Sequence, residues 1–382
     1  MKNAAFQKAL VAAKRGEVDA QFNVGLAYHN GEGVRKDAKK AFNWYLKAAD
    51  QGNDRAQFNV GLAYEYGKGV GKDAKKAFSW YLKAADQGND RAQINVGLAY
   101  EYGEGVRRDA KKAFNWNLKA AEQDNDLAQF YVGLAYDLGE GVRKDAKKAF
   151  NWYLKAAEQD IADAQFNVGF AYYNGEGVRK DAKKAFNWNL KAAEQDIPDA
   201  QFNVGLAYYN GEGVRKDAKK AFNWISKAAG NGDLDAKTLL AIYLIEGLIV
   251  PENFRRAFAL FSEAGDAGNA RAQYFVALCY DEGIGVKPSR VQSLKYLKLA
   301  AKNGDEDAQF AMGDYSQTTK LEDGILKLRD LVGAFAWYSL AEKGGSIEAK
   351  PKLKRLKEEM TEGQISRAKE VARDLMTGRK FQ

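Results

Sequence analysis

A tryptophan recurs every 36 residues over more than half of this 382-residue chain. The members of this series are Trp44, Trp80, Trp116, Trp152, Trp188 and Trp224. Self-similarity at a period of roughly 20–50 residues is typical of repeat architectures, in which each unit buries its apolar side only against its neighbours. The length of the chain therefore indicates a number of repeats rather than a number of globular domains.

The first half of the repeat predicts a helix, called helix A. The unit AQFNVGLAYHNGEGVRKDAKKAFNWYLKAADQGNDR starts at Ala20, and Val24 and Tyr28 follow four and eight residues later. Residues at this spacing share one stripe of an α-helix, which we expect to run to about Asn30. Gly31 follows directly, where a left-handed C-terminal cap favours glycine.

The second half of the repeat predicts another helix, called helix B, which begins after Asp37. Aspartate is a preferred N-cap, and Asn253 and Ser289, which replace it in later copies, are also capping residues. Helix B is amphipathic, with Ala41, Trp44, Tyr45 and Ala48 on its apolar side and Lys39, Lys40, Asn43 and Lys47 on its polar side. Each unit is therefore expected to form a helical hairpin.

Copies of this unit cover most of the chain. Near-copies start at Ala56, Ala92, Ala128, Ala164 and Ala200, and degraded copies start at Ala236, Ala272 and Ala308. We predict an N-terminal capping half-repeat at 1–19, six near-identical repeats at 20–235, three divergent repeats at 236–348 and C-terminal capping helices at 349–382. The half-repeat carries Lys8 in place of tryptophan, as an outer face without a neighbour requires. The near-identity of six copies is compatible with recent duplication and with consensus-style engineering.

The C-terminal segment has the pattern of a closing helix. Thr361 and Gln364 form a capping box, and Gly378 follows the last apolar residue. The apolar stripe consists of Ile365, Ala368, Ala372 and Leu375. We expect this helix to cover the last open repeat, and the alternative is that it docks a partner subunit.

A glycine lies in the middle of helix A in each near-identical copy, at Gly25, Gly61, Gly97, Gly133, Gly169 and Gly205. Each costs about 1 kcal/mol relative to alanine, and all six together cost about 6 kcal/mol, comparable to the net stability of a whole domain. We expect close helix packing to offset this cost. The ring of Trp44 or Tyr28 on a paired helix is predicted to lie against the backbone of Gly25.

The pattern A-x-x-x-x-G-x-x-Y-x-x-G-x-G-V-x-x-D-x-x-x-A-x-x-W, followed by K-A-A, closely resembles the Sel-one-like repeat, a relative of the tetratricopeptide repeat. The resemblance covers the chain from Asn3 to Ala349, and the segment from Trp337 onward resembles the terminal cap of bacterial members. It implies an all-α fold, a right-handed superhelical solenoid of antiparallel helix pairs. It also implies an adaptor or scaffold that binds other proteins.

Two departures from the family pattern are visible. Some secreted bacterial members carry a cysteine pair in every repeat, whereas this chain has only Cys279, so it does not fit the disulfide-rich branch. In the ninth unit, a longer stretch between Gly313 and Asp330 replaces the glycine loop. We expect helix B to resume at Asp330.

The copies differ mainly on the side of helix A that is predicted to face away from helix B. At the positions of residues 29 and 30 they carry His29 and Asn30, Glu65 and Tyr66, Glu101 and Tyr102, Asp137 and Leu138, Tyr173 and Asn174, and Tyr209 and Asn210. Variation on one face of a fixed unit is typical of a recognition surface. The predicted concave binding face consists of Asn59, Asn95, Asn167, Asn203, Glu65, Tyr66, Glu101, Tyr102, Tyr131, Asp137, Tyr173 and Tyr209.

The chemistry of this face suits an extended peptide. Asparagine amides offer donors and acceptors to a peptide backbone, and exposed tyrosines can act as anchors. The carboxylates favour a basic segment of the ligand. The alternative is structural: the asparagines cap or bridge neighbouring helices, and the tyrosines fill gaps.

Catalytic and metal chemistry has little support in these residues. His29 is the only histidine and Cys279 the only cysteine, so neither a catalytic triad nor a zinc set can be assembled. No glycine loop leads through G-K-[ST] into a helix, so phosphate binding is not expected. We therefore predict a protein that is not an enzyme, with no cofactor, metal or small-molecule substrate.

The charge pattern leaves one alternative open. Arg35, Lys36, Lys39, Lys40 and their copies can form a basic ridge, and the net charge is +8, which would suit nucleic acid or an anionic membrane. Glu32 and Asp37 interrupt the ridge, so a solvated outer face is the preferred interpretation. We expect a cytoplasmic monomer, with self-association through the terminal repeats or export of a longer precursor as alternatives.

Overall fold

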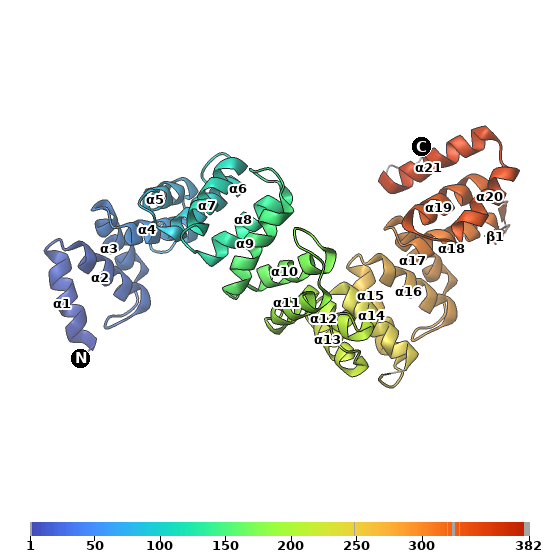
Figure 1. The fold of residues 1–382 in the computed structure, drawn as a ribbon, viewed down its shortest axis with the longest axis horizontal. Helices are drawn as coiled ribbons and strands as arrows, with labels where there is room; N and C mark the ends of the chain where they lie inside the picture. Colours follow the sequence, from blue (N-terminus) through green and yellow to red (C-terminus); the bar gives the residue numbers. More distant parts are fainter. Residues whose placement is uncertain (1, 248, 319, 323–324, 328, 378–382) are drawn as a thin grey trace. The chain divides into compact units, whose positions relative to one another are not determined.

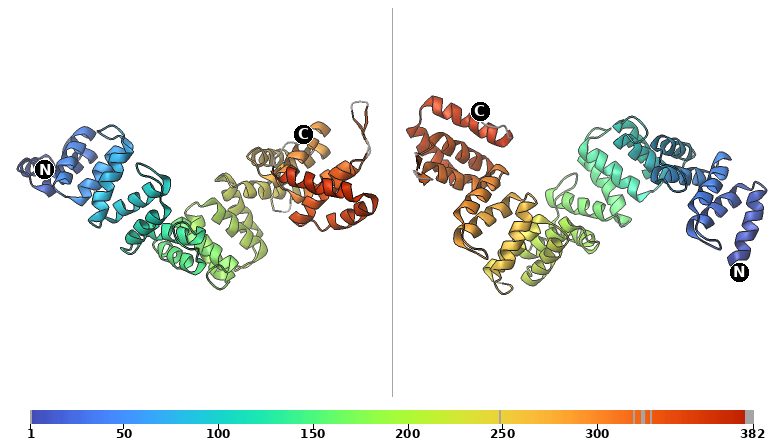
Figure 2. Two further views of the ribbon diagram at one scale, coloured as in Figure 1. Left: turned by 90° about the horizontal axis from the view of Figure 1, so that it is seen from above. Right: turned by 180° about the vertical axis from the view of Figure 1, so that it is seen from behind.

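The computed structural model describes residues 2–247, 249–318, 320–322, 325–327 and 329–377. The chain divides into two compact units, Met1–Gln195 and Asp196–Gln382. Within each unit, helices pack against the helices that precede and follow them in the chain, as Figure 1 and Figure 2 show. Most contacts of a helix are therefore local in sequence, as in a solenoid.

The first unit consists of a single helix followed by helix pairs. Its helices are α1 (Lys2–Lys14), α2 (Val18–Asn30), α3 (Ala38–Asp50), α4 (Asp54–Tyr66), α5 (Ala74–Asp86), α6 (Asp90–Tyr102), α7 (Ala110–Ala121), α8 (Asp126–Leu138), α9 (Ala146–Glu158), α10 (Ala162–Asn174) and α11 (Ala182–Glu194). Even-numbered helices are helix A of a repeat, and odd-numbered helices are helix B. The predicted helical hairpin is confirmed in each of these repeats.

The second unit continues the series and ends in a cap. Its helices are α12 (Pro198–Asn210), α13 (Ala218–Gly230), α14 (Leu234–Glu246), α15 (Phe254–Asp266), α16 (Ala270–Glu282), α17 (Arg290–Lys302), α18 (Glu306–Gln317), α19 (Leu331–Gly344), α20 (Ala349–Glu359) and α21 (Glu362–Thr377). The predicted all-α solenoid of helix pairs is confirmed. The predicted boundaries at 19, 235 and 348 stay predictions.

Among the described residues, a short β-hairpin interrupts the helical structure, and the sequence did not predict it. Strand β1 (Lys320–Glu322) pairs antiparallel with β2 (Ile325–Lys327), with Lys320 opposite Lys327. The hairpin lies in the stretch that replaces the glycine loop of the ninth repeat. Helix α19 then begins after Asp330, whose side chain accepts a hydrogen bond from the Gly333 N–H at 2.8 Å, as predicted.

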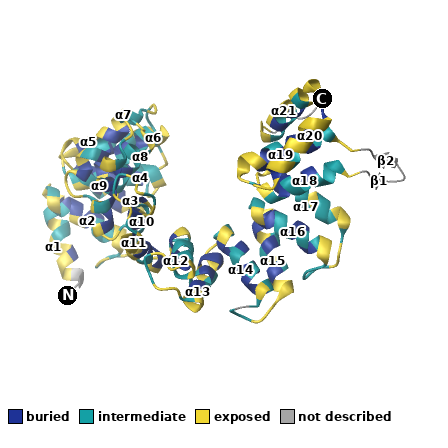
Figure 3. Ribbon diagram, turned by 45° about the vertical axis from the view of Figure 1, so that its right-hand side comes forward, coloured by how far each residue is buried: buried dark blue, intermediate teal, exposed yellow. Residues whose placement is uncertain are grey.

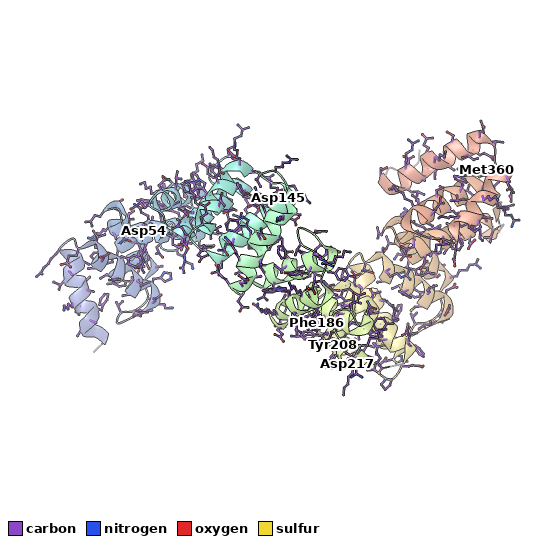
Figure 4. The ribbon with its side chains drawn as sticks, in the orientation of Figure 1. Asp54, Asp145, Phe186, Tyr208, Asp217 and Met360 are labelled. Carbon is purple, nitrogen blue, oxygen red and sulfur yellow. The ribbon has the colours of Figure 1, made fainter. Side chains whose placement is uncertain are left out.

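The helix ends follow the predicted cap chemistry. Gly31 is left-handed, with φ of 81°, and ends α2. At the start of α9, the Asp145 carboxylate accepts a hydrogen bond from the Lys148 backbone N–H at 3.0 Å (Figure 4). The replacements Asn253 and Ser289 cap their helices in the same way. Exposed residues gather at the turns that these caps define (Figure 3).

Replacing Asp145 by alanine is expected to lower the free energy of unfolding by about 1 kcal/mol, because the first turn of α9 loses its side-chain acceptor. Urea denaturation followed by circular dichroism measures this change. Asp145→Asn is the control, since asparagine caps equally well and should leave the urea midpoint close to that of the parent protein. Equal losses in both variants would contradict a capping role.

The tryptophan series is only partly buried, which corrects the predicted core. Tyr45 is 3% exposed, whereas the neighbouring Trp44 is half-buried beneath Lys47, whose ammonium lies 4.4 Å from the ring centroid. Phe42 and Ala49 are also buried, although the apolar stripe proposed for helix B omitted both. Trp44 thus covers the edge of the core, and Tyr45 fills its centre.

The mid-helix glycines permit the close packing that was expected, with a different ring. A Cβ at Gly25 would lie 2.6 Å from the Tyr45 ring, inside van der Waals contact. The ring nearest to Gly25 is that of Tyr45 and not that of Trp44 or Tyr28, so the predicted partner was wrong. Gly61 and Gly133 meet a tyrosine of the following helix B in the same way, which explains why glycine recurs there.

Buried glutamines form a series of hydrogen bonds along the repeats, called here the glutamine ladder, which the sequence did not predict. In the first unit each Oε1 accepts from a glutamine thirty residues later at 2.7–3.0 Å; the accepting residues are Gln21, Gln57, Gln93, Gln129 and Gln165. The Gln57 Nε2 also donates to the Ala49 carbonyl of the preceding helix B at 3.1 Å. The pair Gln57 and Gln87 thus ties helix A to the end of helix B within one hairpin, and the bond to Ala49 joins that hairpin to the one before it.

The C-terminal helix covers the last repeat, as predicted. Helix α21 packs on α19, and Ala368 is fully buried in the cluster around Tyr338 and Leu356. The backbone N–H of Thr361 donates to Gln364 Oε1 at 2.9 Å, which confirms the capping box. Gly378, predicted to end this helix, lies outside the described residues.

Candidate functional site

A large concave feature on the predicted face lies over α4, α5 and α6. It has a volume of about 620 Å³, and four predicted residues line it: Glu65, Tyr66, Asn95 and Tyr102. Helix A supplies these side chains because its exposed stripe faces away from the core. Tyr81 of helix B forms part of the floor, so the pocket is built from both helices of the repeat.

A second pocket lies one repeat earlier, over α2, α3 and α4. Its volume is about 470 Å³, and His29, Asn59 and Tyr66 line it. Tyr66 lines both pockets. The two pockets therefore meet at one tyrosine, and together they are called here the groove of α2, α4 and α6.

A third, much smaller pocket lies at the next repeat, over α6, α7 and α8. The third pocket has a volume of only about 30 Å³, and its lining includes Glu101, Asn117 and Tyr131. Tyr131 stands where Asn59 and Asn95 stand in the wider pockets, so its larger side chain occupies space that is open there.

Some predicted binding residues also support the fold. The Tyr81 hydroxyl donates to the Glu65 carboxylate, and Asn95 also hydrogen-bonds to Tyr81. The Asn59 Nδ2 donates to the Arg55 carbonyl, one turn back in its own helix, at 2.8 Å. Some of the predicted binding residues therefore make hydrogen bonds within the fold, as the structural alternative expected. Their exposed atoms stay available to a ligand.

Burial and nearby charges shift the pKa values of two side chains in these pockets, Tyr81 and Glu101. Burial, followed by the Glu65 carboxylate, raises the pKa of Tyr81 well above its usual value. Burial also raises the pKa of Glu101; the nearby Glu140 carboxylate adds to this effect and Arg108 opposes it. The third pocket thus holds two carboxylates near one another.

Other predicted residues lie elsewhere. Asp137, Asn167 and Tyr173 line none of these three pockets, and Asp137 pairs with Lys144 at 3.8 Å. Asn203 and Tyr209 belong to the second unit. Tyr173 and Tyr209 are about as exposed as Tyr66.

The sequence reading missed the groove residues outside helix A. Among them are Lys72, Tyr81 and Glu104 in the wide pocket, and Arg108, Asn117 and Glu140 were likewise missed in the third pocket. The available signal was variation at one buried position of helix B, which is Tyr45, Tyr81 and then Asn117 in successive copies.

Comparison with known proteins decides the family. The family model of the Sel1 repeat matches nine consecutive segments, residues 18–53, 54–89, 90–125, 126–161, 162–197, 198–233, 234–269, 270–305 and 306–346. The chain belongs to the Sel1 repeat family. The resemblance inferred from the repeat motif is therefore confirmed.

Two solved structures are similar to this Sel1-repeat protein. One is c5321, described as a protective antigen of uropathogenic Escherichia coli with an SLR fold; it is 30% identical, with a TM-score of 0.86, over 100% of this chain and 83% of its own. The other, a Sel1 repeat protein from Oxalobacter formigenes, is 31% identical, with a TM-score of 0.61, over 81% of this chain and 89% of its own. No curated protein sequence matches the chain.

Sel1-repeat proteins are protein-interaction scaffolds, and no catalytic family matches this member. Cys279 is buried, and burial raises the pKa of its thiol to about 11, so it is a poor nucleophile. In the described ranges, no three His, Cys, Asp or Glu side chains gather closely enough to hold a metal ion. No helix among the described residues combines the length and apolarity needed to cross a bilayer.

The basic outer face of this Sel1-repeat protein is partly neutralised. The Lys40 ammonium lies 3.4 Å from the Asp37 carboxylate and 5.4 Å from the centroid of the Tyr28 ring. The equivalent lysines of the next two repeats make the same ion pair, with Asp73 and Asp109. These contacts favour a solvated framework surface over a nucleic-acid or membrane interface.

Proposed function

We propose that this Sel1-repeat protein binds an extended segment of a partner protein in the groove of α2, α4 and α6. One observation carries the proposal: Tyr66 and Tyr102 are 54% and 68% exposed, and both line the same 620 Å³ pocket. Tyrosine combines a large apolar ring with a hydroxyl, so a covered tyrosine contributes strongly to binding.

The polar residues of the groove suit a peptide backbone with basic side chains. Glu65, Asn95 and Glu104 line the pocket that the two tyrosines flank. Carboxylates attract cationic residues, and asparagine can pair with a backbone amide whatever the sequence. Because the pockets meet at Tyr66, an extended chain can occupy both. The predicted contacts Asp137, Asn167, Asn203, Tyr173 and Tyr209 stay predictions and are not part of the groove proposed here.

The test uses peptides selected from a random phage-displayed library against the full chain. In the double variant Tyr66→Ala and Tyr102→Ala, the selected peptides should bind about 30- to 1000-fold more weakly, because two anchor side chains contribute about 2–4 kcal/mol together. Isothermal titration calorimetry measures the dissociation constants. Unchanged circular dichroism would show that the helices are intact.

The matched control is the double variant Tyr173→Ala and Tyr209→Ala, which removes two tyrosines of similar exposure that lie outside the three pockets. Its effect on the same peptides should be below about threefold, since rim or remote contacts contribute little. If the control variant loses binding and the groove variant keeps it, the proposed groove is wrong.

A further inference from the structure

We propose that the third pocket, formed around Glu101, Asn117 and Glu140, takes the ammonium group of a lysine side chain from the bound segment. The inference rests on the proposed function, because Glu101 is adjacent in α6 to Tyr102, which lines the widest part of the groove. The inference predicts that the bound segment carries a lysine at the position that reaches this pocket.

A pair of substitutions makes this pocket different from its neighbours. Helix B carries Asn117 where the two preceding repeats carry Tyr45 and Tyr81, and helix A of the next repeat carries Tyr131 where they carry asparagine. The exchange shortens the side chain at the floor and lengthens the one at the rim. The pocket at this repeat is therefore small, whereas the one before it is wide.

Asn117, which lines this pocket, has a buried acceptor without a partner. It is only 4% exposed, and no donor among the described residues pairs with its Oδ1, which packs over Gly97. The Asn189 Oδ1 is unpartnered in the same way, but Tyr173 stands there in place of Glu101, so the second carboxylate distinguishes the Asn117 pocket. A buried polar atom without a partner is costly and is often explained by a bound group. Since the terminal torsion of asparagine is broad, the amide can turn this oxygen toward the pocket without breaking a hydrogen bond of Oδ1.

The charges of the pocket favour a cation. The Glu101 and Glu140 carboxylates both line it, and burial together with their proximity raises the pKa of Glu101. A bound cation relieves the repulsion between two such carboxylates. Arg108 also lines the pocket, but its side chain is exposed and lies in no ion pair with either carboxylate in the described part of the chain, so it can move toward solvent.

Size and shape favour lysine over arginine. A volume of about 30 Å³ holds one or two water-sized groups, which suits an ammonium but not a planar guanidinium. An ammonium has three donors, and two carboxylates with one amide oxygen match them. Phe114, Leu134 and Ala135 supply apolar walls for the methylene stem.

The test titrates the full chain with n-butylammonium, which is the lysine side chain without its backbone. The protein is labelled with ¹⁵N-asparagine, and the side-chain amide signal of Asn117 is followed by NMR. We expect a saturable shift with n-butylammonium and at least a tenfold weaker response to n-butylguanidinium or 1-butanol. The amide of Asn189, which shares the helix position but has Tyr173 in place of Glu101, is the internal control and should not move.

Two single variants sharpen the test. Glu101→Gln should abolish the shift, whereas Arg108→Gln should strengthen n-butylammonium binding by removing a competing cation. Thermal unfolding checks that both variants fold. An equal response in Glu101→Gln, or equal responses to ammonium and guanidinium, would overturn the lysine pocket. The absence of a saturable shift in the parent protein, as expected if the pocket holds only water, would overturn it as well.

The outcomes separate this inference from the proposed function. The lysine pocket would be rejected, and the groove retained, by two results together. The selected peptides would need Tyr66 and Tyr102 without a preference for lysine, and the Asn117 amide signal would not shift with n-butylammonium. A saturable n-butylammonium shift without any peptide that depends on the two tyrosines would reject the groove instead.

Discussion

Replacing Gly133 by leucine is expected to lower the free energy of unfolding by about 3 kcal/mol, at the upper end of typical overpacking effects. A Cβ at this position would lie 2.6 Å from the Tyr153 ring, which is itself buried. Helix propensity alone predicts the opposite sign, because leucine is a better helix former than glycine by several tenths of a kcal/mol. The sign of the change therefore decides between packing and propensity, and urea denaturation measures it.

Two further variants test the same contact. Gly71 has no heavy atom within 4 Å of a built Cβ and does not have a positive φ, so Gly71→Leu should change stability by less than about 0.5 kcal/mol. Combining Gly133→Leu with Tyr153→Ala should cost less than the sum of the single changes, because leucine then fills the space of the ring. Additive losses would show that the Tyr153 ring is not what requires glycine.

The sequence predicted the helices well because their signals are local. Gly31 ends a helix because glycine tolerates φ of 81°, and Asp145 begins one because its carboxylate accepts a backbone N–H. Both rules depend on a few neighbouring residues. Repetition of the unit then predicted that each hairpin packs on the next.

Choices between adjacent residues were less predictable. Trp44 and Tyr45 are neighbours on helix B, and a shift of about 100° around the helix decides which one faces the core. The sequence pattern allowed both, and only the packing against Gly25 favours Tyr45. The glutamine ladder was not predicted for a similar reason, since residues thirty positions apart meet only after both helices of a hairpin have been placed.

The sequence predicted the helix A residues of the candidate site but not its helix B residues. Variation on helix A identified Glu65, Tyr66 and Tyr102, which the structure brings into one pocket. The floor residues Tyr81 and Asn117 come from helix B, where a buried position is easily assigned to the core alone. Their contribution depends on how far each side chain reaches toward the next repeat, which sequence spacing does not specify.

The second large effect is expected at the C-terminal cap. Ala368→Asp should lower the stability of the last repeat by about 3–5 kcal/mol, because it places an unpaired carboxylate in a fully buried position of α21 against α19. Hydrogen exchange measured by mass spectrometry should show faster exchange across α19 and α21. Helices α12 and α13 should keep their protection, since each repeat of a solenoid depends mainly on its nearest neighbours.

Ser366→Asp is the matched control for this change. It adds the same charge to the same helix at an exposed position, so its effect should stay within about 0.5 kcal/mol. Slow exchange in α19 of the Ala368→Asp variant would mean that α21 can detach without exposing the last repeat. The helix would then not act as a cap, and the alternative that it docks a partner subunit would become the better explanation of its apolar stripe.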